Sequence, residues 1–135
     1  MPVVTVNYLA VLAAAVLSMV VGYIWYHRRV FGTAWMRHAG MTEAKARKDA
    51  GMAMVSMFLV ALVANYVLAH FIDYTYARTF ATGMRTGLWA WLGFSGPVFF
   101  TIAAFERRPV QWFTISAGYQ LCVLLLNGGL LAVWT

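Results

Sequence analysis

Charged residues are scarce in this chain: they make up 10% of its 135 positions, and only four of them are acidic. A soluble domain carries about 25% charged residues, so an ordinary soluble fold is excluded. The chain also has a single cysteine, Cys122, which excludes an internal disulfide. The remaining composition, 63% hydrophobic, is typical of a membrane protein.

The sequence also lacks the residue patterns of most catalytic and metal sites. It contains no Ser–His–Asp arrangement, no phosphate-binding glycine loop and no cysteine, histidine and carboxylate cluster with metal-ligand spacing. Its histidines fall at different predicted depths, with His27 and His38 on one side of the membrane and His70 near the other. We therefore expect no metal and no cofactor, and an enzyme is less favoured than a non-enzymatic protein.

What the chain does have is four long uncharged runs. A helix of about 20 apolar residues, at about 1.5 Å per residue, crosses the roughly 30 Å core of a bilayer. We predict an all-α fold, an integral membrane bundle of four transmembrane helices that forms a single domain over residues 1–135. The first run ends in aromatic and basic residues, so we expect a retained helix and not a signal peptide. The predicted spans cover about residues 3–26, 51–72, 86–105 and 111–134.

Basic residues are distributed unequally among the segments that connect these runs. Eight lie in the first and third segments, whereas only Arg78 and Arg85 lie in the second. The positive-inside rule places the basic side in the cytoplasm and both termini outside it. We expect anionic lipid headgroups as partners there, and no nucleic acid, because the basic residues flank the spans. An apolar and aromatic stretch over residues 30–36 predicts a short interfacial amphipathic segment after the first helix.

Small residues mark the faces where helices are expected to touch. In lipid, such residues allow two helix backbones to approach closely. The partner helix belongs to the same chain, to a second copy in a homo-oligomer or to another membrane protein, and the sequence leaves these alternatives open. Within the third run, Pro97 deprives the Gly93 carbonyl of its helical donor and predicts a kink. The candidate packing residues are Ala10, Ala14, Ser18 and Gly22 in the first run and Gly83 and Gly87 at the start of the third.

Polar side chains inside the membrane need partners there, so they are the candidates for a functional site. The amides of Asn7, Asn65 and Asn127 come from three different runs and share one predicted level toward the outer side. Gln120 and Tyr119 lie deeper. One interpretation is a polar cavity or path lined by these residues. The alternative is that the amides bond across helices and hold the bundle together, at about 0.6–2 kcal/mol each.

Glu106 is the acidic residue at the boundary of a predicted span. It follows the C-terminal end of the third helix, where the helix dipole disfavours an anion, so it needs a cation nearby. A structural ion pair at the inner edge is the plainer interpretation, and a proton-relay carboxylate is the alternative. The candidate cations are Arg107, Arg108, Arg28 and Arg29.

Five short motifs follow one another along nearly the whole chain, at residues 24–26, 31–36, 91–94, 105–109 and 117–119. In order, they resemble the WY, FGxAWM, WLGF, FERRP and NAGYH motifs of a bacterial four-span membrane family, domain of unknown function 1761. The resemblance implies four spans in a bacterial inner membrane and supplies no activity. This chain has Ser116 and Gln120 where the family motif has Asn and His, so any chemical role of that histidine is lost here.

Three hypotheses for function follow from these observations. The first is a non-enzymatic homo-oligomer or accessory membrane subunit. The second is a small transporter or channel whose path is lined by Asn7, Asn65, Gln120 and Asn127. The third is a membrane enzyme that acts on a lipophilic substrate and uses Glu106 with the neighbouring arginines.

Overall fold

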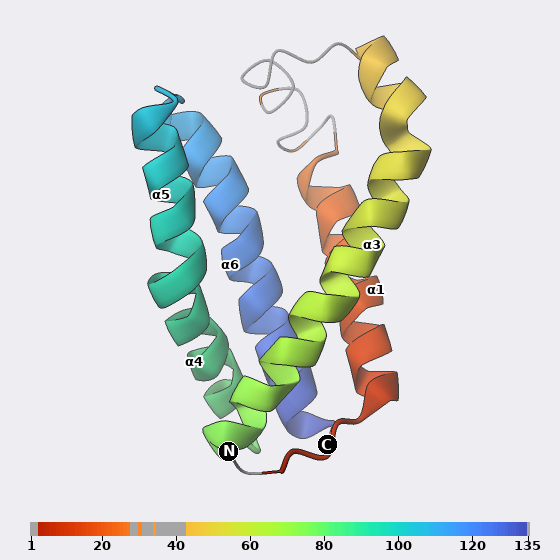
Figure 1. Ribbon diagram of the computed structural model, residues 1–135, viewed down its shortest axis with the longest axis vertical. Helices are drawn as coiled ribbons and strands as arrows, with labels where there is room; N and C mark the ends of the chain where they lie inside the picture. Colours follow the sequence, from red (N-terminus) through yellow and green to blue (C-terminus); the bar gives the residue numbers. More distant parts are fainter. Residues whose placement is uncertain (1–2, 28–29, 31–33, 35–42, 135) are drawn as a thin grey trace.

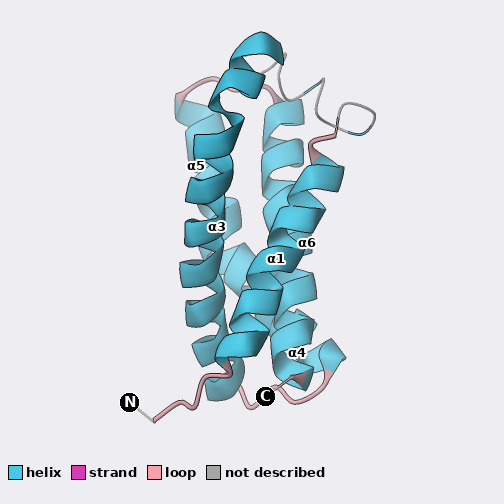
Figure 2. Ribbon diagram, turned by 90° about the vertical axis from the view of Figure 1, so that its right-hand side faces the viewer, coloured by secondary structure: helices cyan, strands magenta, loops and turns pink. Residues whose placement is uncertain are grey.

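The computed structural model describes residues 3–27, 30, 34 and 43–134, with the side chains of residues 43–50 left out. The described residues are mostly helical, with loops and turns between the helices, and contain no strand (Figure 2). This confirms the predicted all-α fold. The elements are α1 (Tyr8–Trp25), α3 (Glu43–Tyr74), α4 (Phe80–Ala90), the π-helix η2 (Trp91–Ser95), α5 (Gly96–Phe105) and α6 (Val110–Val133).

Within the described residues, four helical segments are long and apolar enough to cross a membrane. The third of them joins α4, η2 and α5 end to end, and the two ends of the chain lie at the same end of the bundle (Figure 1). The protein is therefore a multi-pass membrane protein. Most of the predicted interfacial segment, together with Arg28 and Arg29, lies outside the described residues. The spans are Tyr8–Trp25, Gly51–Tyr74, Phe80–Phe105 and Val110–Val133.

Capping side chains decide where two of these helices begin. The Asn7 side-chain oxygen accepts hydrogen bonds from two backbone N–H groups of the first turn, at 3.1 and 3.2 Å. The first helix therefore begins at Tyr8, whereas the uncharged run already begins near residue 3. Thr79 and Thr82 form a capping box, so the third span begins at Phe80 and not near residue 86.

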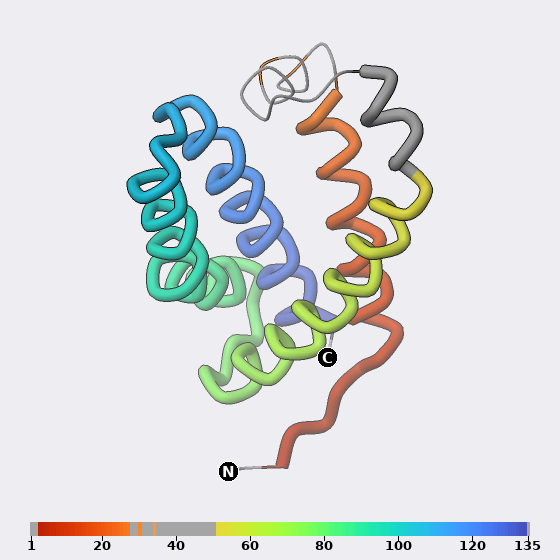
Figure 3. The backbone as a smooth tube through the Cα atoms, turned by 45° about the horizontal axis from the view of Figure 1, so that its top comes forward, coloured from red at the N-terminus to blue at the C-terminus, as the bar shows by residue number. Residues whose placement is uncertain are grey.

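Helix α6 is the centre of the bundle. It runs between α1 on one side and α4 with α5 on the other (Figure 3). Of its membrane span 56% is buried inside the protein, against 28% for α1 and far less for the other two spans. Two indole N–H groups fasten neighbouring segments to its backbone. Trp25 donates to the Ile115 carbonyl at 2.9 Å, and Trp91 donates to the Ala117 carbonyl at 2.8 Å.

Helices α4 and α6 touch backbone to backbone. A Cβ atom placed on Gly83 would lie 2.1 Å from the Gly128 carbonyl oxygen, and one on Gly87 would lie 2.1 Å from the Leu124 carbonyl oxygen. Real Cβ contacts are essentially never closer than 3.0 Å. Glycine is therefore required at both positions, and the partner of this glycine pair is α6 of the same chain.

The small residues of α1 also face helices of the same chain. Ala10 and Ala14 are fully buried, and Ser18 is 4% exposed. Gly22 faces the Tyr119 ring of α6, since an added Cβ would lie 3.1 Å from the Tyr119 hydroxyl oxygen. This stripe therefore packs against α3 and α6 inside the bundle.

The third span changes its helical geometry near its middle. The Gly96 N–H donates to the carbonyl of Trp91, a five-residue spacing that defines the π-helix η2. Pro97 follows and has no N–H to give to Gly93. The irregularity that Pro97 predicts is thus a π-helix over Trp91–Ser95.

Candidate functional site

Ser18 is the meeting point of three helices. Its Oγ atom accepts a hydrogen bond from Asn127 Nδ2 of α6 at 2.8 Å and a long one from Asn65 Nδ2 of α3 at 3.5 Å. The same hydroxyl donates to the Ala14 carbonyl at 2.9 Å. The backbone carbonyl of Ser18 accepts a hydrogen bond from the Tyr119 hydroxyl at 2.8 Å. We call this group of four side chains, Ser18, Asn65, Asn127 and Tyr119, the Ser18 cluster.

Most of the hydrogen-bonding capacity of the Ser18 cluster is used within the bundle. Asn65 also donates to the Ala61 carbonyl one turn earlier, at 2.8 Å. Asn127 is 1% exposed, and its Oδ1 atom has no hydrogen-bond partner among the described residues. Hydrogen bonds of this kind across helices hold transmembrane bundles together. The geometry therefore gives Asn127 and Ser18 a packing role.

Asn7 does not join this cluster. It caps α1, and its Nδ2 atom lies 3.4 Å from the Trp134 carbonyl oxygen. There it borders a small cavity of about 40 Å³ that Asp73 and Arg78 also line. The structure thus brings Asn65, Asn127 and Tyr119 together and places Asn7 apart. The sequence predicts Ser18 as a packing residue, and its hydroxyl within an apolar run is the signal for its second role as a hydrogen-bonding partner.

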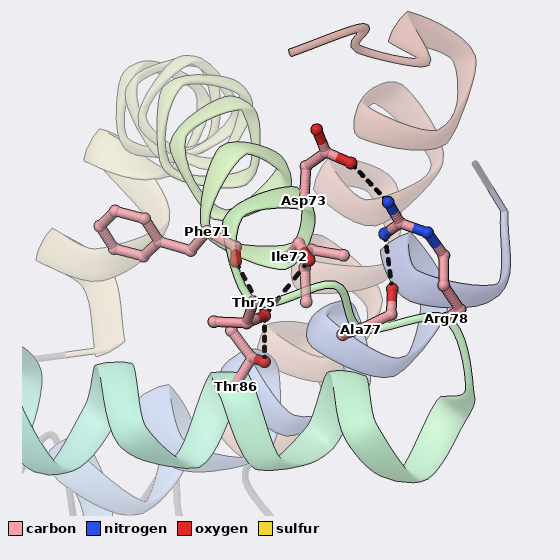
Figure 4. Close-up of polar contacts among 7 residues, drawn as sticks. All are labelled: Phe71, Ile72, Asp73, Thr75, Ala77, Arg78 and Thr86. Carbon is pink, nitrogen blue, oxygen red and sulfur yellow. Dashed lines mark hydrogen bonds and ion pairs between the residues drawn. The ribbon is translucent and has the colours of Figure 1, made fainter. Parts of the chain in front are cut away.

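Hydrogen bonds and an ion pair hold the segment between α3 and α4 in place (Figure 4). Asp73 and Arg78 form an ion pair at 2.7 Å, and Arg78 also donates to a backbone carbonyl at 2.9 Å. The Thr75 hydroxyl bonds to two α3 carbonyls and to the Thr86 hydroxyl of α4, the last at 2.9 Å (Figure 4). Tyr76 takes a positive φ of 55° in the turn. These contacts fix the entry angle of the third span.

The opposite end carries Glu106. This residue is exposed and forms the C-cap of α5, and Arg107 after it takes a positive φ of 53°. The Arg108 guanidinium lies 5.5 Å from the ring centroid of Trp112, a cation–π distance. Because Arg28 and Arg29 lie outside the described residues, the ion pair between Glu106 and these arginines stays a prediction.

A large apolar cavity lies between α1 and α3. The two helices cross, and toward the end of α1 they separate (Figures 1 and 2). The cavity there has a volume of about 470 Å³, and Tyr119 of α6 also lines it. Gly22 and Ala53 keep its walls open because their side chains are small. The other described residues of its wall are methionines and tyrosines: Met19, Met54, Met57, Tyr23, Tyr26 and Tyr119.

A second, smaller cavity adjoins the first. It has a volume of about 90 Å³ and shares Met19, Met57 and Tyr119 with the large cavity. Its wall also includes Ser18, Asn65 and Gln120. Within the described part of the chain, the Gln120 side chain has no hydrogen-bond partner. The large apolar cavity therefore adjoins a smaller, mostly apolar one whose wall carries a few polar side chains.

The fold and these cavities define a class: a four-helix integral membrane protein with a hollow between two of its helices. Comparison with known families agrees with the motif resemblance. The chain belongs to the family described as Protein of unknown function (DUF1761), which matches residues 9–132. No curated protein and no solved structure matches the chain.

Four of the described residues in or beside the family motifs contact α6 or belong to it: Trp25, Trp91, Gly118 and Tyr119. Trp25 and Trp91 donate to α6 carbonyls, and Tyr119 of α6 donates to the Ser18 carbonyl of α1. Gly118 lies against Trp25, where an added Cβ would be 3.1 Å from the indole ring. In this chain, these motif residues therefore position the helices that form the two cavities.

Proposed function

We propose that this protein is a non-enzymatic membrane protein that binds a lipophilic molecule in the cavity between α1 and α3. The observation that carries the proposal is the volume of about 470 Å³. Pockets that hold small molecules span about 300–1,000 Å³ and are mostly apolar. A site at this position takes its ligand from the bilayer, because the exposed Met54 and Tyr23 form its rim.

The side chains of the wall suit such a ligand. Met19, Met54 and Met57 are flexible and polarizable, so they adapt to an irregular apolar surface. The rings of Tyr26 and Tyr119 lie 5.4 Å apart at their centroids and provide a firm wall beside them. This combination favours a bulky lipophilic body over a single water-filled path.

A cavity-filling variant tests the proposal. In Ala53→Trp a large ring replaces a small side chain of the cavity wall, whereas Val55→Trp adds the same ring at an exposed position two residues later. Two residues turn a helix by about 200°, so Val55 points to the other side. The probe is hexadecane bearing a diazirine, photoactivated in nanodiscs and mapped by mass spectrometry.

We expect saturable labelling of cavity residues in the wild type and in Val55→Trp, and loss of that labelling in Ala53→Trp. Labelling that does not saturate, and that spreads evenly over the lipid-facing surfaces of all helices, would overturn the proposal. Equal elution and equal thermal unfolding of the three proteins serve as the control for folding.

The other two hypotheses make different demands on the site. A transport path needs amides that are free to bind a solute, whereas Asn65 and Asn127 bond to Ser18. An enzyme that uses Glu106 needs that carboxylate at the cavity, and Glu106 is an exposed helix cap outside the cavity wall. These observations support binding without chemical conversion.

We also propose that the chain works as a homo-oligomer or as an accessory subunit of another membrane protein. Support comes from the third span, of which only 6% is buried inside the chain and which presents wide apolar faces. Native mass spectrometry from mild detergent separates the cases. A defined multiple of the chain mass supports the oligomer, a complex with a second protein supports the subunit, and a bare monomer contradicts both.

The proposed setting is a bacterial inner membrane with both termini outside the cytoplasm. The ends of the chain lie opposite the end that carries Arg107 and Arg108, where anionic headgroups are the proposed partners (Figure 1). Fusions at the C-terminus test this orientation. Alkaline phosphatase should be active there and green fluorescent protein dark, and the reverse result would contradict the orientation.

A further inference from the structure

We infer that the ligand of this site is a neutral lipophile with a terminal carbonyl or hydroxyl group, and that Gln120 binds this group in the smaller cavity. The inference rests on the proposed function and adds the chemical class of the ligand. It is carried by the juxtaposition of a large apolar cavity with a smaller, mostly apolar cavity whose wall includes the amide of Gln120.

The two cavities share walls. Met19, Met57 and Tyr119 line both, so a molecule whose body fills the larger one reaches the smaller one with its end. The smaller cavity, at about 90 Å³, has room for a compact end group. The shape of the two joined cavities therefore favours a ligand that has an apolar body and a small polar end group.

Among the described residues of the smaller cavity, Gln120 has an amide whose donors and acceptor are all unused, whereas Asn65 already uses its Nδ2 group. The Ser18 hydroxyl already donates to Ala14 and accepts from Asn127, and the Tyr119 hydroxyl donates to the Ser18 carbonyl. The Gln120 amide, which carries two donor hydrogens and an acceptor oxygen, has no partner among the described residues. A polar group in an apolar setting without a partner costs free energy, so a ligand group that pairs with it gains affinity.

The lack of charge in the cavity walls narrows the class of ligand further. Every described residue in the walls of the two cavities is uncharged. Moving a carboxylate or a phosphate into such a site without a counter-ion is strongly unfavourable. Fatty-acid anions and phospholipid headgroups are therefore excluded as the polar end group, and a neutral carbonyl or hydroxyl remains.

The test is a competition in nanodiscs against the diazirine-bearing hexadecane. The competitors share one chain length and differ at the end: hexadecane, hexadecanol, a hexadecanone and hexadecanoate. One net hydrogen bond predicts that the alcohol or the ketone competes about 3- to 10-fold better than the alkane. A preference for the ketone indicates that the natural ligand carries a quinone-like carbonyl group. A preference for the alcohol indicates a prenol or a fatty alcohol. Hexadecanoate should compete least.

Two variants assign the preference to Gln120. Gln120→Leu and the closer match Gln120→Met should both keep saturable labelling and lose the preference for a polar end. If labelling in the wild type does not saturate, the proposed function fails. If it saturates without any preference, if hexadecanoate competes best, or if a folded Gln120→Met keeps the preference, the site stands and this inference is overturned.

Discussion

The contact between α4 and α6 makes a quantitative prediction for Gly87→Ala. The new Cβ would lie 2.1 Å from the Leu124 carbonyl oxygen, about 1.3 Å short of the 3.4 Å at which ordinary contact begins. The obstacle is backbone, so no side-chain rotation relieves it and the two helices must separate. Overpacking of this kind costs about 1–3 kcal/mol. Alanine gains up to about 1 kcal/mol over glycine in helix propensity, so we expect a net loss of about 0–2 kcal/mol against the wild type.

Unfolding by sodium dodecyl sulfate, followed by circular dichroism in mixed micelles, measures this loss. Gly93→Ala is the matched control, because it lies in the same span and an added Cβ meets nothing within 4 Å. The control should be neutral or slightly stabilising. Gly129→Ala, whose added Cβ has its nearest contacts with the movable Phe80 ring, should fall between the two. If Gly87→Ala were as stable as Gly93→Ala, the reasoning about backbone contact would be refuted.

Three further variants probe other contacts by the same assay. Ser18→Ala removes the acceptor of Asn127 and should cost about 1–2 kcal/mol; no loss would mean that the cluster does not hold the helices. Trp91→Phe removes an indole donor to α6 and should cost about 1 kcal/mol, and an unchanged midpoint would contradict the anchoring role. Asp73→Asn breaks the ion pair with Arg78, which is exposed, so the loss should stay below about 1 kcal/mol.

The four spans were predictable because lipid leaves the backbone no other partner. A membrane segment must satisfy its own N–H and C=O groups, so length and hydropathy suffice to place a helix. The exact starts depended on single side chains. The Asn7 cap shortens the first helix to Tyr8, and the Thr79 capping box lengthens the third span back to Phe80.

The polar site was predictable only in part. Asn65, Asn127 and Tyr119 come together as one interpretation of the sequence expects, but their common partner is Ser18, from the stripe that was assigned to packing. Depth along a helix is readable from sequence, whereas the direction of a side chain around the helix depends on which neighbours it has. The cavity between α1 and α3 depends on the angle at which these helices cross, and no residue pattern encodes that angle directly.

The most direct test of the central claim is native mass spectrometry of the protein released gently from the membrane in which it is expressed. The wild type and Val55→Trp should carry a neutral lipophilic adduct of reproducible mass, and Ala53→Trp should not. The same adduct on all three proteins, or only a phospholipid mixture on each, would contradict a ligand site between α1 and α3.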